Sequence, residues 1–399
     1  MDLYLQMGHG MQSLTEKLIK DWHGGTVILS PVNIPKGRLY SYAKRVHNIG
    51  GSVLFDPQLF YPKDGHTKLK EYDYWPLEGV SISESDTNKK ICNELLRINN
   101  NINSSAIILP SIEIKEDKFA YSINHMENYA KFFSSKSDKP LYATICLYSE
   151  TIRNNQAIEF LVEYLRTLPV DGFYIIPQPA NGEYIVSDPL WVVGMLKLIT
   201  CLKLSKKFVI TGYTNHQGLL YSIAGADVIA SGNFMNTRSF NPSKFKSHKD
   251  DIKQKSTWYY LPSAFCEYKA ALLDIAQSRG FLDLFQTNGN FNNEYSSMLF
   301  KGARPSSTNY DERNSFLHYL HCLKTQCELL TKKTYMDTYC TYEFLLSSAE
   351  KKMKDIKKFG MTGQNRDFSP AIETNRIAMC ANNQDYGLKL RLDWNEIKH

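Results

Sequence analysis

The chain has 399 residues, of which 43% are hydrophobic and 22% are charged. This length fits one large domain or two of ordinary size, and this composition excludes a chain that is disordered throughout. The formal net charge of +6 is small for the length, and because no stretch approaches about 18 uninterrupted apolar residues, we expect no membrane span.

From residue 26 onward, short apolar runs alternate with segments of helical periodicity, which is the pattern of strands connected by helices. A polar helix at residues 12–22 comes before this alternation, and glycines 24 and 25 end it. The predicted strands cover residues 26–31, 51–60, 105–114, 141–147, 172–177, 207–213, 227–231 and 257–262. The predicted helices that connect and follow them cover residues 35–48, 88–99, 118–133, 151–168, 189–204, 215–226 and 263–279.

Eight strands with helices between them predict an α/β fold, a (β/α)8 barrel of the TIM type with a helical C-terminal addition. The main rival is a doubly wound open sheet, but no Gly-x-Gly-x-x-Gly turn follows the first strand. We assign residues 1–285 to the barrel and its N-terminal helix, and residues 286–399 to a mainly helical C-terminal region. In that region we predict helices at 318–330 and 342–358, irregular chain from 359, and a terminal strand within 386–394.

Residues 207–240 show the strand, helix and strand pattern most clearly. Their sequence is KFVITGYTNHQGLLYSIAGADVIASGNFMNTRSF. Gly225 ends the predicted helix where a left-handed turn is easy. The loop after the second strand carries Asn233, Asn236, Thr237 and Arg238, at the end of a strand where a β/α barrel keeps its chemistry.

This stretch resembles the tRNA-guanine transglycosylases, barrel enzymes that exchange a guanine in RNA for a 7-deazaguanine, with a branch that acts on DNA. The family has a strand ending in Gly-x-Gly, a helix, and a Gly-x-Asp strand leading to Thr-Arg. A second similarity is Asp56-Pro57-Gln58-Leu59-Phe60, at the place of the family's Asp-Ser-Gly-Gly-Phe-Gln loop. A third is NSFLHYLHCLKTQCELLT at 314–331, which is similar to a helix near the end of the family's barrel.

The sequence also departs from the family pattern. At the place of the family's nucleophilic Asp it has Ala230, which offers no nucleophile. The base-recognising Asp of the third strand falls near Pro110 and Ser111, with Glu113 as the nearest carboxylate. Cys322, Cys327 and Cys340 are too scattered for the family's zinc motif, so we expect no metal and no other cofactor.

The resemblance implies roles for particular side chains. Asp56 matches a carboxylate that acts as general acid and base, although an Asp that caps the loop before Pro57 is an equally ordinary interpretation. Glu113 is the candidate to replace the lost base-binding carboxylate. Gln58, Gln178 and Tyr213 are the candidates for contacts to the base, and a structural bond to a loop carbonyl is the alternative for Gln58.

Basic residues gather after the seventh predicted strand. Arg238 can pair with phosphate in bidentate fashion, or can form an ordinary salt bridge. The lysines Lys244, Lys246 and Lys249 are candidates for nucleic-acid contact, with a solvated loop as the alternative.

The residues leave three hypotheses open. The first is a transglycosylase-like protein that handles guanine or 7-deazaguanine bases in tRNA or DNA. The second is a nucleic-acid-binding subunit of the same fold that has lost the chemistry, and the third is a barrel hydrolase acting on a nucleoside. The eight cysteines stand singly and the N-terminus lacks a secretory signal, so we expect a cytoplasmic protein, and the resemblance leaves a homodimer or hetero-oligomer open.

Overall fold

A curved sheet of parallel strands forms the centre of the molecule. The computed structural model describes residues 1–64, 66–77, 82, 85–246 and 256–398. Along the sheet the strands follow the order β3-β2-β1-β9-β8-β7-β6-β4, and every neighbouring pair is parallel. They are β1 (Asp2–Gln6), β2 (Thr26–Leu29), β3 (Ser52–Phe55), β4 (Ile107–Leu109), β6 (Leu141–Leu147), β7 (Gly172–Pro177), β8 (Phe208–Thr211) and β9 (Val228–Ser231), with the short β5 (Glu113–Ile114) beside the end of β6.

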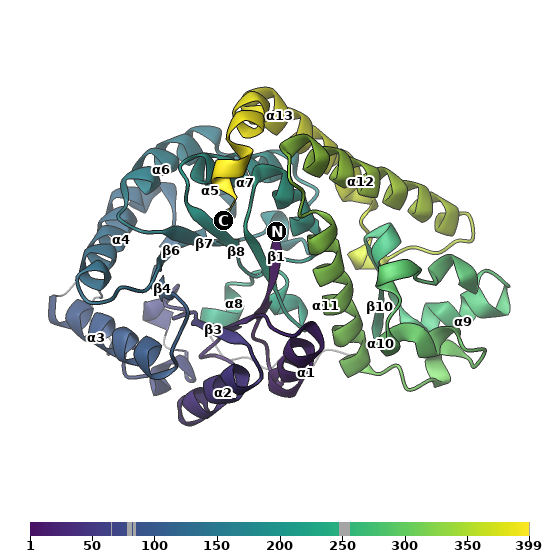
Figure 1. The fold of residues 1–399 in the computed structure, drawn as a ribbon, viewed down its shortest axis with the longest axis horizontal. Coiled ribbons are helices and arrows are strands. Elements are labelled where there is room, and N and C mark those ends of the chain that lie inside the picture. The colour runs from purple at the N-terminus through teal and green to yellow at the C-terminus, as the bar shows by residue number, and fades with distance from the viewer. Residues whose placement is uncertain (65, 78–81, 83–84, 247–255, 399) are drawn as a thin grey trace.

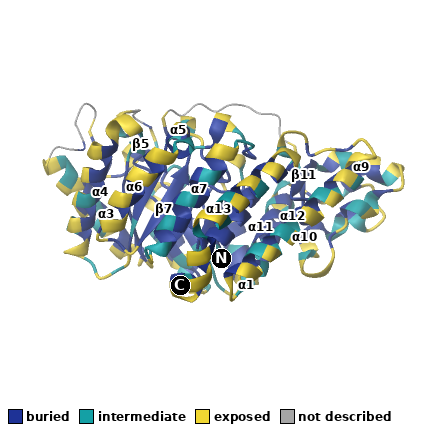
Figure 2. Ribbon diagram, turned by 90° about the horizontal axis from the view of Figure 1, so that it is seen from above, coloured by how far each residue is buried: buried dark blue, intermediate teal, exposed yellow. Residues whose placement is uncertain are grey.

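Helices connect the strands and cover the outer face of the sheet. Figure 1 shows them one after another around the strands, and Figure 2 shows the strands largely buried behind them. The chain therefore belongs to the α/β class, as predicted. The connecting helices are α1 (Gln12–Trp22), α2 (Lys36–Asn48), α3 (Ser85–Asn101), α4 (Phe119–Ser134), α5 (Ser149–Arg153), α6 (Asn155–Thr167), α7 (Pro189–Leu204) and the 3-10 helix η5 (His216–Ala224).

The alternation of side chains along each strand creates two apolar clusters. Val27, Phe55 and Ile175 pack with the helices, whereas Ile28, Leu54 and Ile176 belong to a second cluster on the opposite, inner face. Successive strand residues point to opposite faces. Asp56, two residues after Leu54, is therefore expected on the inner side, which is where the structure places it.

The two ends of the sheet approach each other. The backbone N–H of Ser105, just before β4, donates to the carbonyl oxygen of Val53 in β3 at 3.1 Å. Farther along, the N–H of Glu113 donates to the carbonyl of Phe60 at 3.3 Å. The sheet is thus strongly curved, with β3 and β4 as neighbours.

The prediction that residues 257–262 form the eighth strand of the parallel sheet was wrong. Residues 258–261 do form β10 (Trp258–Leu261), but it pairs in antiparallel fashion with β11 (Cys266–Lys269) outside the parallel sheet. The place in the sheet belongs to β1, between β2 and β9. Sequence analysis missed β1 although Leu3 and Leu5 alternate with polar residues and are both buried; a run of five residues is a weak signal beside the helix that follows.

The C-terminal region is mainly helical, as predicted. It contains α10 (Glu294–Ser297), α11 (Glu312–Leu329), α12 (Tyr335–Lys357) and α13 (Ser369–Ile397), whereas α8 (Ser243–Lys246) and α9 (Ala270–Ser278) lie before residue 286. Helix α11 packs against β1 and η5, and α13 packs along α7.

The predicted terminal strand at 386–394 was also wrong, because these residues lie inside α13. Leu390 and Trp394 are buried, whereas Leu388 and Leu392 are 70% and 74% exposed. Each pair is four residues apart and so lies on one helical face. Two faces occupied by apolar side chains produced an alternation that imitates a strand.

Candidate functional site

Asp56 lies at the carboxyl end of β3 and is fully buried. Its Oδ2 accepts hydrogen bonds from the hydroxyls of Tyr213 at 2.9 Å and Tyr174 at 3.2 Å. Its Oδ1 accepts the backbone N–H of Gln58 at 3.0 Å. Three separate parts of the sheet thus converge on this carboxyl group, since Tyr174 belongs to β7 and Tyr213 follows β8.

Gln58 extends this network toward β2. Its Nε2 donates to the hydroxyls of Tyr213 at 2.8 Å and Ser30 at 2.7 Å, and its Oε1 accepts the N–H of Val32 at 3.1 Å. Gln58 and Tyr213 both have a positive φ, 54° and 50°. Residues other than glycine rarely adopt this left-handed backbone conformation. Where they do, the surrounding structure must hold the strained backbone in place, and such positions are frequent at functional sites.

Gln6 at the end of β1 completes the polar group, and sequence analysis did not identify it. Its Oε1 lies 2.9 Å from the Tyr174 hydroxyl, whose single proton is shared between Gln6 and Asp56. Its Nε2 is buried and, within the described ranges, has no hydrogen-bond partner. A buried donor without a partner is costly, and such groups are often those that meet a ligand. Sequence analysis missed Gln6 because it did not predict β1, the strand that Gln6 ends.

The environment of Asp56 changes its acidity. Burial raises the pKa of the Asp56 carboxyl from 3.8 to about 7, and the hydrogen bonds from Gln58, Tyr213 and Tyr174 oppose this rise only in part. The pKa of the Tyr213 and Tyr174 hydroxyls lies well above 10, first because of burial and then because of the Asp56 charge. Asp56 can therefore exchange a proton near neutral pH while both tyrosines stay neutral.

Ala230 lies on the same inner face as Asp56. It belongs to the inner cluster together with Tyr174 and Tyr213, and it pairs with Tyr4 across β1 and β9. The groups that bond Asp56 within the described chain are tyrosine hydroxyls and a backbone amide, and no second carboxylate is among them. The arrangement supplies a proton donor and acceptor without an adjacent carboxylate nucleophile.

Aromatic side chains cover the network. Phe240 and Phe245 stack with ring centroids 5.3 Å apart, and both contact Tyr213 and Phe60 edge to face at 5.1–5.8 Å. We call Phe60, Phe240 and Phe245 the aromatic cap. The void beside Tyr213 and Phe240 holds about 30 Å³, which is the room of one water molecule. Asp56 itself is closed off from solvent in this structure.

Glu113 and Gln178 lie outside the bonds to Asp56. Glu113 accepts the hydroxyl of Tyr61 at 2.6 Å and pairs with Lys115 at 3.3 Å. Gln178 is half-buried at the end of β7 and accepts the N–H of Ser149 at 3.4 Å. The structure thus brings together Asp56, Gln58 and Tyr213, whereas Glu113 bonds Tyr61 and Lys115 and Gln178 supports the start of α5.

Arg238 is locked in a buried ion-pair cluster. Its Nη1 is 3.1 Å from Glu267, its Nε donates to the carbonyl of Gly232, and its guanidinium lies 3.5 Å from the centre of the Tyr319 ring. Arg366 and the Tyr184 hydroxyl also bond Glu267. With its side chain 3% exposed, Arg238 cannot contact a phosphate without leaving Glu267, and this geometry argues against its predicted role.

The three lysines predicted to contact nucleic acid differ in their surroundings. Lys246 is exposed at the end of α8, and its Nζ lies 4.4 Å from the centre of the Tyr61 ring. Lys244 is half-buried on the same short helix. Lys249 lies outside the described residues. Lys244 and Lys246 flank Phe245 of the aromatic cap in the sequence of α8.

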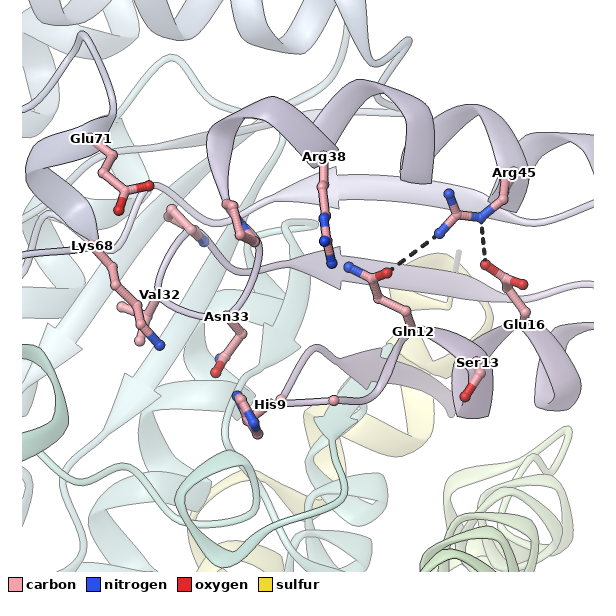
Figure 3. A pocket seen from close by; sticks show the side chains of 14 residues that line it. His9, Gln12, Ser13, Glu16, Val32, Asn33, Arg38, Arg45, Lys68 and Glu71 are labelled. Atoms are coloured by element: carbon pink, nitrogen blue, oxygen red, sulfur yellow. Dashed lines mark hydrogen bonds and ion pairs between the residues drawn. The ribbon is translucent and has the colours of Figure 1, made fainter. Parts of the chain in front are cut away.

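A cavity of about 580 Å³ opens beside the Asp56 network. The loops after β1 and β2 line it, together with the first residues of α1 and α2, and Figure 3 shows Arg38 and Lys68 among its side chains. Sequence analysis did not identify these residues. They match no sequence motif, and they come from the loops after β1, β2 and β3 and from helices α1 and α2.

In the part of the chain that the structure describes, no three His, Cys, Asp or Glu side chains group as metal ligands. None of the described helices combines the length and the apolar character needed to cross a bilayer. Comparison with protein-family models and with curated protein sequences found no match. The transglycosylase resemblance therefore rests on the sequence motifs alone.

Proposed function

We propose that this chain is a (β/α)8 barrel of the tRNA-guanine transglycosylase type, which handles a guanine or 7-deazaguanine base of a nucleic acid at Asp56. Two features support the barrel. Eight parallel strands alternate with helices, and the hydrogen bond from Ser105 to Val53 joins the two ends of the sheet. Asp56 lies at the carboxyl end of a strand, where such barrels hold their catalytic residues.

The observation that carries the proposal is the buried carboxyl of Asp56 beside the unpartnered amide of Gln6. The Watson–Crick edge of guanine has two neighbouring N–H donors and one carbonyl acceptor. The Nε2 of Gln6 can donate to the guanine carbonyl, while the Asp56 carboxyl acts on the other side of the base, at N9. Enzymes that act on a base in nucleic acid read this edge in a closed pocket, after taking the base out of its stack.

The chemistry we propose uses Asp56 as general acid and base. Its carboxyl gives a proton to the departing guanine as the bond between C1′ and N9 breaks. The carboxylate then takes a proton from N9 of the incoming base, or from water, as the new bond to C1′ forms. A pKa near 7 suits both steps, because the group must gain and lose a proton at the working pH. Ala230 means that no covalent intermediate forms at the family's usual position.

Release of labelled guanine tests the proposal. The chain is incubated with RNA and DNA that contain labelled guanine, with and without a free 7-deazaguanine. We expect release by the wild type and a rate at least about 100-fold lower for Asp56→Asn. Asp117→Asn is the matched control, because Asp117 is exposed away from the network. No release from either nucleic acid, with equal behaviour of all three proteins, overturns the catalytic proposal.

Ala230 and the aromatic cap favour a second candidate, a subunit of the same fold that binds nucleic acid without chemistry. In this candidate Asp56 contacts the base but no bond breaks. The chain then binds guanine-containing strands in a gel-shift series, with affinity that falls as salt rises, and releases no guanine. Absence of binding at low salt excludes it.

A further inference from the structure

The cavity beside the Asp56 network has the size of a ligand site. Its volume of about 580 Å³ lies within the range of about 300 to 1,000 Å³ that is usual for small-molecule pockets. It is lined by residues 8–10 after β1, by residues 12, 13 and 16 of α1, by residues 31–33 and 35 after β2, and by side chains of α2 and of the loop after β3. The loops after β1, β2 and β3 all follow the carboxyl ends of strands. The cavity therefore opens at the same end of the sheet as Asp56.

Two cationic side chains of this cavity, the exposed Arg38 and the half-buried Lys68, have no partner among the residues that the structure describes. Within the described residues, neither the guanidinium of Arg38 nor the ammonium of Lys68 has a hydrogen bond or an ion pair, and Figure 3 shows Arg38 directed from α2 toward the side of Gln12. Arg45 is occupied, because it bonds Glu16 at 2.9 Å and Gln12 at 3.4 Å. Glu71 is the remaining acidic group of the lining. An unpaired guanidinium and an unpaired ammonium in the lining of one cavity favour an anionic ligand.

The backbone around the cavity adds donors. The first N–H groups of a helix have no partner inside the helix. At α1 and α2 the residues before the first turn are Met11 and Pro35, whose side chains cannot accept these N–H groups. Gly10 has open space around its Cα, so a ligand can approach the backbone of the loop after β1 closely at this position, beside His9. These donors supplement the two cations.

Hydrogen bonds connect this cavity to Asp56. Asn33, in the cavity wall, donates through Nδ2 to the Ser30 hydroxyl at 3.0 Å. The same hydroxyl accepts Nε2 of Gln58 at 2.7 Å, and Gln58 bonds the Tyr213 hydroxyl that bonds Asp56. The wall of the cavity and Asp56 are therefore joined by a continuous chain of hydrogen bonds.

We propose that this cavity binds a phosphate group of the nucleotide whose base reaches Asp56, through Arg38 and Lys68. The identity of the base rests on the function proposed above, whereas the phosphate site stands on the cavity and its cations. The phosphate can belong to a nucleic-acid strand or to a mononucleotide. A guanidinium and uncapped helix starts suit phosphate oxygens in either case.

Two probes separate these sources. The first is an abasic deoxyribose-phosphate oligonucleotide, which carries phosphates without any base, and the second is guanosine 5′-monophosphate compared with guanosine. Binding of each is measured by calorimetry to wild type, Arg38→Gln, Lys68→Gln and Lys44→Gln. Lys44 is the matched control because it is exposed on α2, carries the same charge and does not line the cavity. Unchanged thermal unfolding of the variants shows that they are folded.

We expect Arg38→Gln and Lys68→Gln each to weaken phosphate-dependent binding about tenfold or more, and Lys44→Gln to change it much less. Loss restricted to the abasic strand identifies a strand phosphate, with a salt slope lower by about one for each variant. Loss restricted to guanosine 5′-monophosphate, with guanosine unaffected, identifies a mononucleotide. Equal behaviour of all three variants, or no binding of either phosphate probe, overturns the proposal. Failure of guanine release leaves the abasic result intact, so the two proposals fail separately.

Discussion

The burial of Asp56 couples the protonation of its carboxyl to the stability of the fold. An ionised carboxylate is costly away from water, and two tyrosine hydroxyls with one amide N–H compensate only part of this cost. In the folded chain the pKa of Asp56 is about 7, whereas in the unfolded chain it is close to 3.8. The folded state therefore holds a proton that the unfolded state has lost between these two pH values.

This difference predicts a pH-dependent cost that Asp56→Asn removes. Because the folded pKa is raised, the contribution of Asp56 to stability falls as pH rises from about 4 to about 7 and stays constant above that. Between pH 5 and pH 8 the wild type should lose roughly 2 to 3 kcal/mol more than Asp56→Asn. Urea unfolding of both proteins at the two pH values measures it. Equal pH dependence of the two would show that Asp56 titrates normally.

Gly8 is required by close contact, not by its backbone conformation. A Cβ atom at this position would lie 2.0 Å from Oδ1 of Asn233, whose Nδ2 donates to the carbonyl of His9 at 2.9 Å. Gly37 in α2 has open space around its Cα. The two glycines thus differ in what an added methyl group would meet.

We expect Gly8→Ala to lower the free energy of unfolding by about 1 to 3 kcal/mol, because Asn233 must move and lose its bond to His9. Gly37→Ala should raise it by up to about 1 kcal/mol, since alanine favours the helix. Denaturant titration of both variants is the measurement. A neutral Gly8→Ala would mean that the loop after β1 adjusts easily.

At the scale of elements, Glu267 connects the sheet to the C-terminal region. It lies in β11, and its carboxylate bonds Arg238 from the loop after β9 and Arg366 from the turn before α13. Burial alone would raise the pKa of Glu267, but Arg366 and Arg238 together lower it to about 2. The predicted phosphate ligand Arg238 is thus a structural residue in this conformation.

Removal of this charge should destabilise the chain. Glu267→Gln leaves the buried guanidinium of Arg238 and the partly buried one of Arg366 without their anion, so we expect a loss of about 3 to 5 kcal/mol at pH 7. Because the folded pKa is depressed, this contribution is present above pH about 4.5 and is lost as pH falls toward 2. Urea unfolding at pH 7 and at pH 3 measures the cost, which should shrink at the lower pH. Glu163→Gln, in a pair on the exposed face of α6, is the control and should change little.

At the scale of the molecule, residues beyond 285 support the sheet. Helix α11 packs on β1, where Lys324 pairs with Asp2 and the Met1 amine donates to Thr331 at 2.8 Å. Helix α13 packs along α7, which is buried on most of its surface. The predicted boundary at 285 therefore separates segments that share one core.

A fragment of residues 1–285 should not fold cooperatively, because β1 and α7 would expose their apolar side chains. The full chain should show one sharp thermal transition with near-ultraviolet circular dichroism, and the fragment should show neither. Limited proteolysis gives a second measurement. A stable fragment with native-like spectra would establish residues 1–285 as an independent domain.

The sequence by itself determined the α/β class, most helix and strand positions, and the location of Asp56 at the end of a strand. Hydrophobic periodicity carries this information because it depends on neighbours along the chain. Only the tertiary structure decided that β1 completes the sheet in place of residues 258–261, that Gln6 and Tyr174 join Asp56, and that Arg238 is buried. Partners such as Gln6 and Tyr174 are 168 residues apart in sequence. No local pattern specifies contacts at that separation, since they arise from the curvature of the sheet and the order of its strands.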